Sequence, residues 1–179
     1  MPQHQPLNRK QRQSRLEAQR RQKRPVVDMY NIIKYFVLCI LFSLIAIGMK
    51  MVVLNAVRIS PTPEIGNGML TLSEIRNTGA AFGLFAGQQD TIIVVSALAV
   101  LVITFIVIAA SSRISRSALP AMSFLSTGIL MNMLDRIQYG YVIDYIKINA
   151  MPNFPYFNVP DIMVVVGAVC LVLAIITRK

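Results

Sequence analysis

Two aspartates lie beside the last apolar segment of this sequence, Asp144 within YGYVIDYIKI and Asp161 within FNVPD. Two close carboxylates in a poorly solvated site cannot both ionise easily, so one of them keeps a proton. The ionised member can then take a proton from water, while the neutral member can donate one to a carbonyl oxygen. The pair therefore predicts the acid–base chemistry of aspartyl proteolysis. On position alone, Asp161 is better explained as a capping acid at a membrane boundary, and only its pairing with Asp144 favours catalysis.

Other catalytic chemistries find no matching set of residues. The only histidine, His4, lies in a basic N-terminal region, so the sequence offers no serine or cysteine with a histidine partner. Cys39 and Cys170 both lie inside apolar runs, where they are expected to be small buried side chains rather than a disulfide or metal ligands. No cluster of His, Cys and acidic residues has the spacing of a zinc site. We therefore expect neither a metal nor another cofactor.

The composition indicates an integral membrane protein. Hydrophobic residues make up 55% of the 179 residues, the mean hydropathy is +0.57, and only 15% of residues are charged. A soluble domain usually has about 25% charged residues. The length suffices for one domain of ordinary size. The deficit of charge and the excess of apolar residues together favour a chain that lies in a bilayer.

Four apolar runs come close to the ~20 residues that a helix needs to cross a bilayer. The third is dotted with Ser, Thr, Gly and Asn, and the first holds a single charge, Lys50, which is expected to snorkel toward the nearer surface. The fold class is therefore predicted to be an all-α membrane protein with four transmembrane helices, at residues 35–54, 91–110, 117–134 and 159–177.

The basic character of the chain belongs to its N-terminal end. Residues 1–34 hold nine Lys/Arg and two acidic residues, so this segment carries +7 of the net charge of +10. It is predicted to be a disordered basic tail, separate from a catalytic membrane domain at residues 35–179. Because the charge lies in a tail and not on a binding face, we expect no nucleic-acid partner. A helix such as RLEAQRRQKR lying on anionic lipid is an alternative to a purely topogenic tail.

The remaining cations orient the four runs. Arg113 and Arg116 lie in the short loop 111–117, and Arg178 and Lys179 end the chain. Lys and Arg are enriched in cytoplasmic loops. Both termini are therefore predicted to lie in the cytoplasm, and the two longer connections, which hold Asp144 and a loop near residue 77, on the outer side.

Polar residues end the third run. Asn132, Asp135 and Arg136 stand at positions i, i+3 and i+4, so they share one helical face. Ionisable groups at membrane depth are costly and normally face a protein interior or a wet cavity. We expect Asp135 and Arg136 to act mainly as a structural pair between helices, with substrate contact as the alternative.

Local patterns predict the surroundings of the two aspartates. Asp144 lies in an alternating stretch that should be extended, and Asn158 should cap the last helix, with Pro160 in its first turn. Asn77-Thr78-Gly79 is a turn signal followed at once by the apolar residues AAFGLF. That loop either dips to the membrane surface over a lipid-bearing substrate or is an ordinary hairpin with interfacial aromatic anchors.

Three blocks of this sequence resemble lipoprotein signal peptidase, the bacterial signal peptidase II family. They are RNTGAAFG at 76–83, GILMNMLDRIQYGYVIDY at 128–145 and FPYFNVPD at 154–161, and the similarity covers roughly residues 35–177. The resemblance implies an intramembrane aspartyl endopeptidase of the bacterial inner membrane. Its expected substrates are prolipoproteins, cut just before a diacylglyceryl-modified cysteine, and its surroundings are membrane lipids. It also implies a small β-like cradle and a loop on the outer side of the four helices, and we expect a monomer.

The motifs of that family also imply roles for single residues. Its catalytic pair falls in VIDY and FNVPD, that is, on Asp144 and Asp161. Supporting or substrate-binding roles carry over to a further set: Asn77, Gly79, Asn132, Asp135, Arg136 and Asn158.

The chain departs from the family pattern at four positions. The family has an acid four residues before the lysine of the first span, and here Ala46 precedes Lys50; the other departures are Met131, Pro160 and Ile162. The alternatives are an inactive homologue that binds lipidated peptides, or a small transporter or proton relay. A relay favours acids spread along the spans, whereas Asp135, Asp144 and Asp161 are predicted near one surface.

The tail is predicted to be dispensable for chemistry, because the charge rule puts it on the opposite side of the membrane from the two aspartates. Deleting residues 1–24 should leave prolipoprotein cleavage by correctly inserted protein within about threefold, or less than ~1 kcal/mol of barrier. The measurement is the cleavage rate of purified truncated protein, normalised to the fraction in the membrane. A loss of about a hundredfold would contradict the predicted topology.

Overall fold

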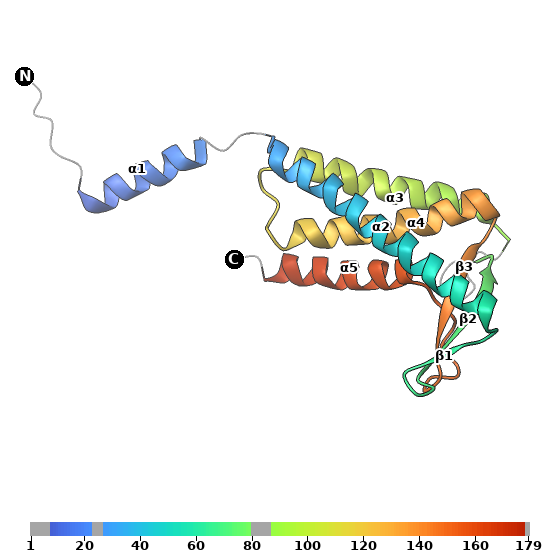
Figure 1. Ribbon diagram of the computed structural model, residues 1–179. Coiled ribbons are helices and arrows are strands. Elements are labelled where there is room, and N and C mark those ends of the chain that lie inside the picture. Colours follow the sequence, from blue (N-terminus) through green and yellow to red (C-terminus); the bar gives the residue numbers. More distant parts are fainter. Residues whose placement is uncertain (1–7, 23–26, 80–86, 178–179) are drawn as a thin grey trace, which may run out of the picture.

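The computed structural model describes residues 8–22, 27–79 and 87–177, and every structural statement below concerns these residues. They form a mostly helical protein with one small antiparallel sheet (Figure 1). The elements in chain order are α1 (Arg9–Gln22), α2 (Met29–Ile59), β1 (Glu64–Ile65), β2 (Leu70–Asn77), α3 (Gln89–Ala109), α4 (Ala118–Tyr139), β3 (Val142–Ile148) and α5 (Val159–Ile176).

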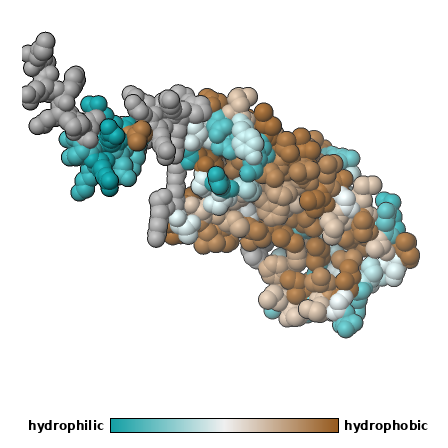
Figure 2. All heavy atoms as spheres, turned by 60° about the vertical axis from the view of Figure 1, so that its left-hand side comes forward, coloured by the Kyte–Doolittle hydropathy of each residue, from teal (hydrophilic) through white to brown (hydrophobic). Residues whose placement is uncertain are grey.

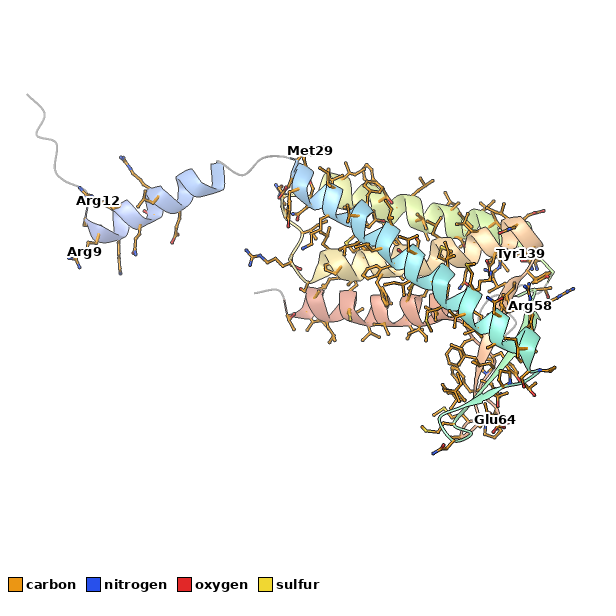
Figure 3. The ribbon with its side chains drawn as sticks, in the orientation of Figure 1. Arg9, Arg12, Met29, Arg58, Glu64 and Tyr139 are labelled. Carbon is orange, nitrogen blue, oxygen red and sulfur yellow. The ribbon has the colours of Figure 1, made fainter. Side chains whose placement is uncertain are left out.

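A helix forms at each of the four expected apolar runs, although the bounds differ. Three of them, α2, α3 and α5, are long and apolar enough to cross a membrane. Helix α2 extends beyond the expected 35–54 at both ends. It starts early because Asp28 caps it with hydrogen bonds to the amides of Tyr30 and Asn31. A further helix, α1, forms where composition alone predicts disorder. Helix α1 lies apart from the bundle in Figure 1. Arg9 and Arg12 lie on the part of α1 that is farther from the bundle in Figure 3.

Helix α4 differs from the three apolar spans because it is the centre of the bundle. It packs against α2, α3 and α5. Its buried hydroxyls are satisfied locally: the Ser123 hydroxyl donates to the Leu119 carbonyl at 2.9 Å, and the Thr127 hydroxyl donates to the Ser123 carbonyl at 2.8 Å. The Tyr35 hydroxyl of α2 donates to the Ser126 hydroxyl at 2.8 Å. Ser123, Ser126 and Thr127 of the third apolar run therefore face protein, while the outer surfaces of α2 and α3 are apolar.

Figure 2 shows where this apolar surface lies. Hydrophobic residues dominate the visible face of the helical bundle, and the hydrophilic colour gathers on α1 and toward the ends of the bundle. Large apolar side chains such as Leu44, Leu101 and Phe105 are more than half exposed. Contiguous exposed apolar surface of this extent is typical of contact with lipid.

The two ends of the bundle are built differently. At one end, the backbone amide of Asp28 donates to the Ser111 hydroxyl at 2.9 Å, and the Asn31 amide donates to the Ser111 carbonyl at 2.8 Å. These bonds join the start of α2 to the connection between α3 and α4. At the other end lies the sheet, as Figure 1 shows. In Figure 3, Met29 marks the first end and Tyr139 the second.

The sheet has the order β1-β2-β3 and positions the residues of the candidate site. Gly140 ends α4 in the left-handed conformation (φ 79°), which turns the chain directly into β3. Strands β2 and β3 are antiparallel, with Ile75 opposite Asp144 and Asn77 opposite Val142. Extended backbone at Asp144 is therefore confirmed.

A small apolar cluster fastens the sheet to the bundle. Leu72 of β2 and Ile143 and Tyr145 of β3 pack with Val53 of α2. The sheet is therefore held to the bundle by side chains buried against the end of α2.

Helices α4 and α5 approach closely at two glycines. A β-carbon at Gly128 would lie 2.5 Å from the Pro160 carbonyl oxygen, and one at Gly167 would lie 2.6 Å from the Leu125 amide nitrogen. Small residues at such positions let helix backbones pack in contact. Because Pro160 precedes Asp161, Gly128 sets the distance between α4 and the first turn of α5.

Replacing Gly128 by alanine should therefore destabilise the protein, by about 1–3 kcal/mol from overpacking. The measurement is the thermal unfolding midpoint of purified protein in detergent. Gly48→Ala in α2 is the matched control, since nothing lies within 4 Å of its added β-carbon, and it should be neutral or slightly stabilising. Equal midpoints for the two variants would contradict the close approach of α4 and α5.

Candidate active site

A cavity of about 900 Å³ lies where the sheet meets α4 and α5. Its walls come from β2, β3, the segment before α5 and the facing turns of α3, α4 and α5. Six of the eight residues singled out from the sequence line it: Asn77, Gly79, Asn132, Arg136, Asp144 and Asp161. Of the other two, Asn158 lies directly behind this wall, and Asp135 points elsewhere.

Asp144 is held on β3 by two side-chain amides. Its side chain is buried, with the residue only 3% exposed. Oδ2 accepts a hydrogen bond from Asn77 Nδ2 at 2.9 Å, and Oδ1 accepts one from Asn158 Nδ2 at 3.1 Å. Asn77 is itself fixed, because its Oδ1 accepts from the Gly79 amide at 2.9 Å. The Asn77-Thr78-Gly79 turn therefore delivers a donor to Asp144.

Asp161 is held by the cap of α5. Its backbone amide donates to Asn158 Oδ1 at 2.8 Å, and its Oδ2 accepts from the Asn158 backbone amide at 2.9 Å. This reciprocal arrangement is a capping box, with Pro160 in the first turn. The predicted cap at Asn158 is thus confirmed. The remaining oxygen, Oδ1, accepts from Asn132 Nδ2 of α4 at 2.7 Å.

Asn158 joins the two carboxylates. Its Oδ1 is occupied by the Asp161 amide, so its Nδ2 faces acceptors: Asp144 Oδ1 at 3.1 Å and Asn132 Oδ1 at 3.0 Å. Asn132 in turn donates to Asp161. One closed set of hydrogen bonds therefore contains both carboxylates and two amides, and Asn158, which is 1% exposed, is its centre.

Burial is the main cause of the raised pKa of Asp144. It raises the pKa of Asp144 to about 7, and the nearby Asp161 carboxylate raises that pKa as well, while the Asn77 amide and the Arg136 charge act in the opposite direction. A carboxyl group with such a pKa is partly neutral at physiological pH. It can therefore donate a proton as well as accept one.

Arg136 contributes both charge and donors to the cavity wall. It is 7% exposed, and its guanidinium donates to the Gly79 carbonyl from Nη2 at 2.7 Å and to the Asn132 carbonyl from Nη1 at 3.1 Å. Within the described part of the chain, its buried Nε has no hydrogen-bond partner. Arg136 thus ties the turn at Gly79 to α4 and keeps one donor unused.

The structural role expected for Asp135 between helices does not come from pairing with Arg136. Asp135 instead forms an ion pair with Lys50 of α2, whose Nζ lies 2.6 Å from Oδ1 and 2.8 Å from Oδ2. The prediction that Lys50 snorkels toward the nearer surface is also wrong, because its side chain is held at Asp135. The reason is direction: Asp135 faces α2 and the start of β3, where Oδ2 also accepts the Ile143 amide at 3.4 Å, while Arg136 faces the cavity.

Sequence reasoning therefore missed the partner of Asp135, and the lysine in an apolar run was the available signal. Two of the departures from the family pattern lie in contact with each other. Ala46 of α2 and Met131 of α4 pack together with Met163 of α5 in one apolar cluster. No group of three or more His, Cys, Asp or Glu residues capable of holding a metal occurs among the residues described. The apolar loop at 80–86 lies outside the described residues.

Breaking the ion pair should destabilise the protein more than removing it. Asp135→Asn leaves the Lys50 ammonium unpaired in a mostly buried position, a change that costs about 3–5 kcal/mol at fully buried pairs and less here. The double variant Lys50→Met/Asp135→Asn should recover part of the loss. The measurement is the thermal unfolding midpoint of each variant. A double variant less stable than Asp135→Asn would contradict this assignment.

Comparisons with known proteins agree with this architecture. The family described as signal peptidase (SPase) II matches residues 25–177. The lipoprotein signal peptidase of Enterococcus faecalis is 31% identical over 147 residues, covering 80% of this chain and 90% of that protein. That of Halothermothrix orenii is 33% identical, covering 69% and 82%. A solved bacterial membrane enzyme has the same fold, with a TM-score of 0.71 at 22% identity over 82% of this chain and 92% of that one. The chain therefore belongs to the signal peptidase II family.

Proposed function

We propose that this protein is an aspartyl endopeptidase that removes signal peptides from prolipoproteins, with Asp144 and Asp161 as its catalytic pair. Membership of the signal peptidase II family supports the reaction. One observation supports the assignment of the pair: the two carboxylates line the same cavity and share Asn158 as a hydrogen-bond partner.

The two carboxylates take different roles in this proposal. Asp144, whose pKa is raised to about 7 by burial and by Asp161, carries the proton. Asp161 stands in the first turn of α5, where two amides donate to it and the helix terminus favours negative charge. Asp161 takes a proton from a water molecule, whose oxygen attacks the scissile carbonyl carbon, while Asp144 protonates the carbonyl oxygen. Collapse of the tetrahedral intermediate breaks the C–N bond, and the leaving nitrogen receives the proton held by Asp161. One hydroxyl of the intermediate returns its proton to Asp144 as the carbonyl re-forms, which restores both carboxyl groups to their starting states.

Three polar residues support this reaction by position. Asn77 and Asn132 each donate to one carboxylate, which fixes its orientation. Arg136 lines the cavity, and its guanidinium is suited to a carbonyl oxygen of the bound peptide. Gly79 supplies the carbonyl that holds Arg136. Preorganised groups of this kind lower the barrier because they need not reorient during the reaction.

We propose further that α4 crosses the bacterial membrane together with the three apolar helices, which gives four spans. It runs from the end of the bundle where α3 ends to the opposite end, where β3 and the rest of the sheet lie (Figure 1). The charge rule then puts both termini and the basic tail in the cytoplasm, and the sheet outside. The substrate is a prolipoprotein with a lipid-modified cysteine, and one copy of the chain suffices, because all proposed site residues come from one chain.

The alternative of a proton relay is not favoured by the site. Its third acid, Asp135, is bound to Lys50, and the other two lie on one cavity rather than along a path between the ends of the bundle. An inactive homologue is distinguished from an active enzyme by the experiment that follows.

Asp144→Asn and Asp161→Asn should each lower the rate of signal-peptide cleavage by at least about a hundredfold, since each removes one partner of the acid–base pair. Both variants should insert and fold, because asparagine keeps the shape of aspartate. The measurement is cleavage of a diacylglyceryl-modified prolipoprotein, followed by mass spectrometry of the product.

Asp90→Asn is the matched control for Asp161. Asp90 also lies in the first turn of an apolar helix, α3, but it is exposed to solvent and does not line the cavity. This variant should cleave at the wild-type rate. If either Asp144→Asn or Asp161→Asn keeps near wild-type turnover, that aspartate has no catalytic role.

A further inference from the structure

Lys147 contacts a wall of the cavity without lining the cavity itself. It lies on β3, and its Nζ donates to the Pro152 carbonyl at 2.8 Å and to the Phe154 carbonyl. The ammonium also lies 5.4 Å from the centre of the Tyr156 ring, which is a cation–π contact. One side chain thus holds three points of the segment 152–156.

Residues 153–157 form one wall of the cavity, which is also lined by Asp144 and Asp161. Phe154 and Phe157 meet edge to face within it, with ring centres 5.7 Å apart. The wall is therefore mainly aromatic, and Phe154 is 40% exposed. Such a surface fits an apolar part of a bound lipopeptide.

The wall depends on Lys147 because its backbone has few other partners, among them the Phe154 amide, which donates to the Met151 carbonyl at 3.0 Å. Its end at Phe157 is clamped to β3, where the Phe157 amide donates to the Ile146 carbonyl and the Phe157 carbonyl accepts two amides. Pro152 and Pro155 have no amide hydrogen, so the segment before Phe157 cannot extend this ladder. The carbonyls that point back toward β3 receive the Lys147 ammonium instead.

We propose that Lys147 is a positioning residue that sets the shape of this aromatic wall, and thereby the affinity of the site for its lipopeptide substrate. The inference rests on the proposed function and adds a determinant of substrate binding to it. Lys147 does not hold the reacting carboxylates. It contacts backbone carbonyls and a ring of the wall, whereas the two carboxylates are held by Asn77, Asn132 and Asn158.

The test is a graded series of substitutions at Lys147, measured as kcat and KM for a diacylglyceryl-modified prolipoprotein. Lys147→Met keeps the length of the side chain but removes its donors, and KM should rise at least about fivefold while kcat stays within about twofold. Lys147→Gln, which can still bind one carbonyl, should fall between Met and wild type. Lys147→Arg should restore KM to within about twofold, because a guanidinium can bind both carbonyls and the ring.

Asn149→Ala is the control. Asn149 lies just beyond β3 and donates to the Gly68 carbonyl at 2.8 Å, so this variant disturbs the same strand end without touching the wall. Its KM should match that of wild type, and the pH dependence of kcat should be the same in all variants.

Two outcomes overturn the inference while leaving the proposed function intact: an unchanged KM in Lys147→Met, or a fall in kcat with KM unchanged. A rise in KM that Lys147→Arg does not reverse also overturns it, because the contacts to the carbonyls would then not be the cause. If wild-type protein does not cleave the prolipoprotein at all, the proposed function fails and this inference fails with it. Lys147→Gln keeps the test informative should Lys147→Met not fold.

Discussion

The hydrogen bonds of Asn158 are the interaction on which the rest of the site depends. Two carboxylates in one poorly solvated cavity repel each other, and each needs donors to remain there. Asn158 supplies a donor to each carboxylate. Its backbone amide donates to Asp161 within the cap of α5, and its side-chain amide donates to Asp144 on β3. A residue that stabilises a helix terminus thus also fixes the relation between strand and helix. The local capping of α5 therefore also sets the geometry of the site.

The remainder of the fold keeps this junction in place. Gly128 lets α4 lie against the first turn of α5, so that Asn132 can reach Asp161. The ion pair between Lys50 and Asp135 fastens α2 to the end of α4 from which β3 departs. Retaining Asp144 in this setting has a cost. Because the pKa of Asp144 is raised to about 7 in the folded protein, its contribution to stability is largest at low pH and is lost as the pH rises through that value.

Much of this arrangement follows from local sequence signals. The four helical runs, the extended stretch around Asp144 and the cap at Asn158 each have a pattern spanning a few residues, and each forms as predicted. Tertiary choices do not have such patterns. Asp135 and Arg136 are adjacent and share a helical face in projection, yet one turns to Lys50 and the other to the Gly79 carbonyl, because α2 and the β2 turn lie on different sides of α4. The role of Lys147 was equally hidden, since it depends on how a proline-containing segment folds back onto β3.

Burial beside Asp161 raises the pKa of Asp144 to about 7, and the proposed division of roles between the two carboxylates follows from this shift. The most direct test is a carboxyl infrared titration of the purified protein, with the band of Asp144 identified by its loss in Asp144→Asn. We expect a protonated carboxyl group whose titration midpoint lies near a pH of about 7, and a lower midpoint in Asp161→Asn, because a neighbouring charge is removed. A carboxyl group of Asp144 that is fully ionised at neutral pH, with a midpoint near about 4, would contradict it.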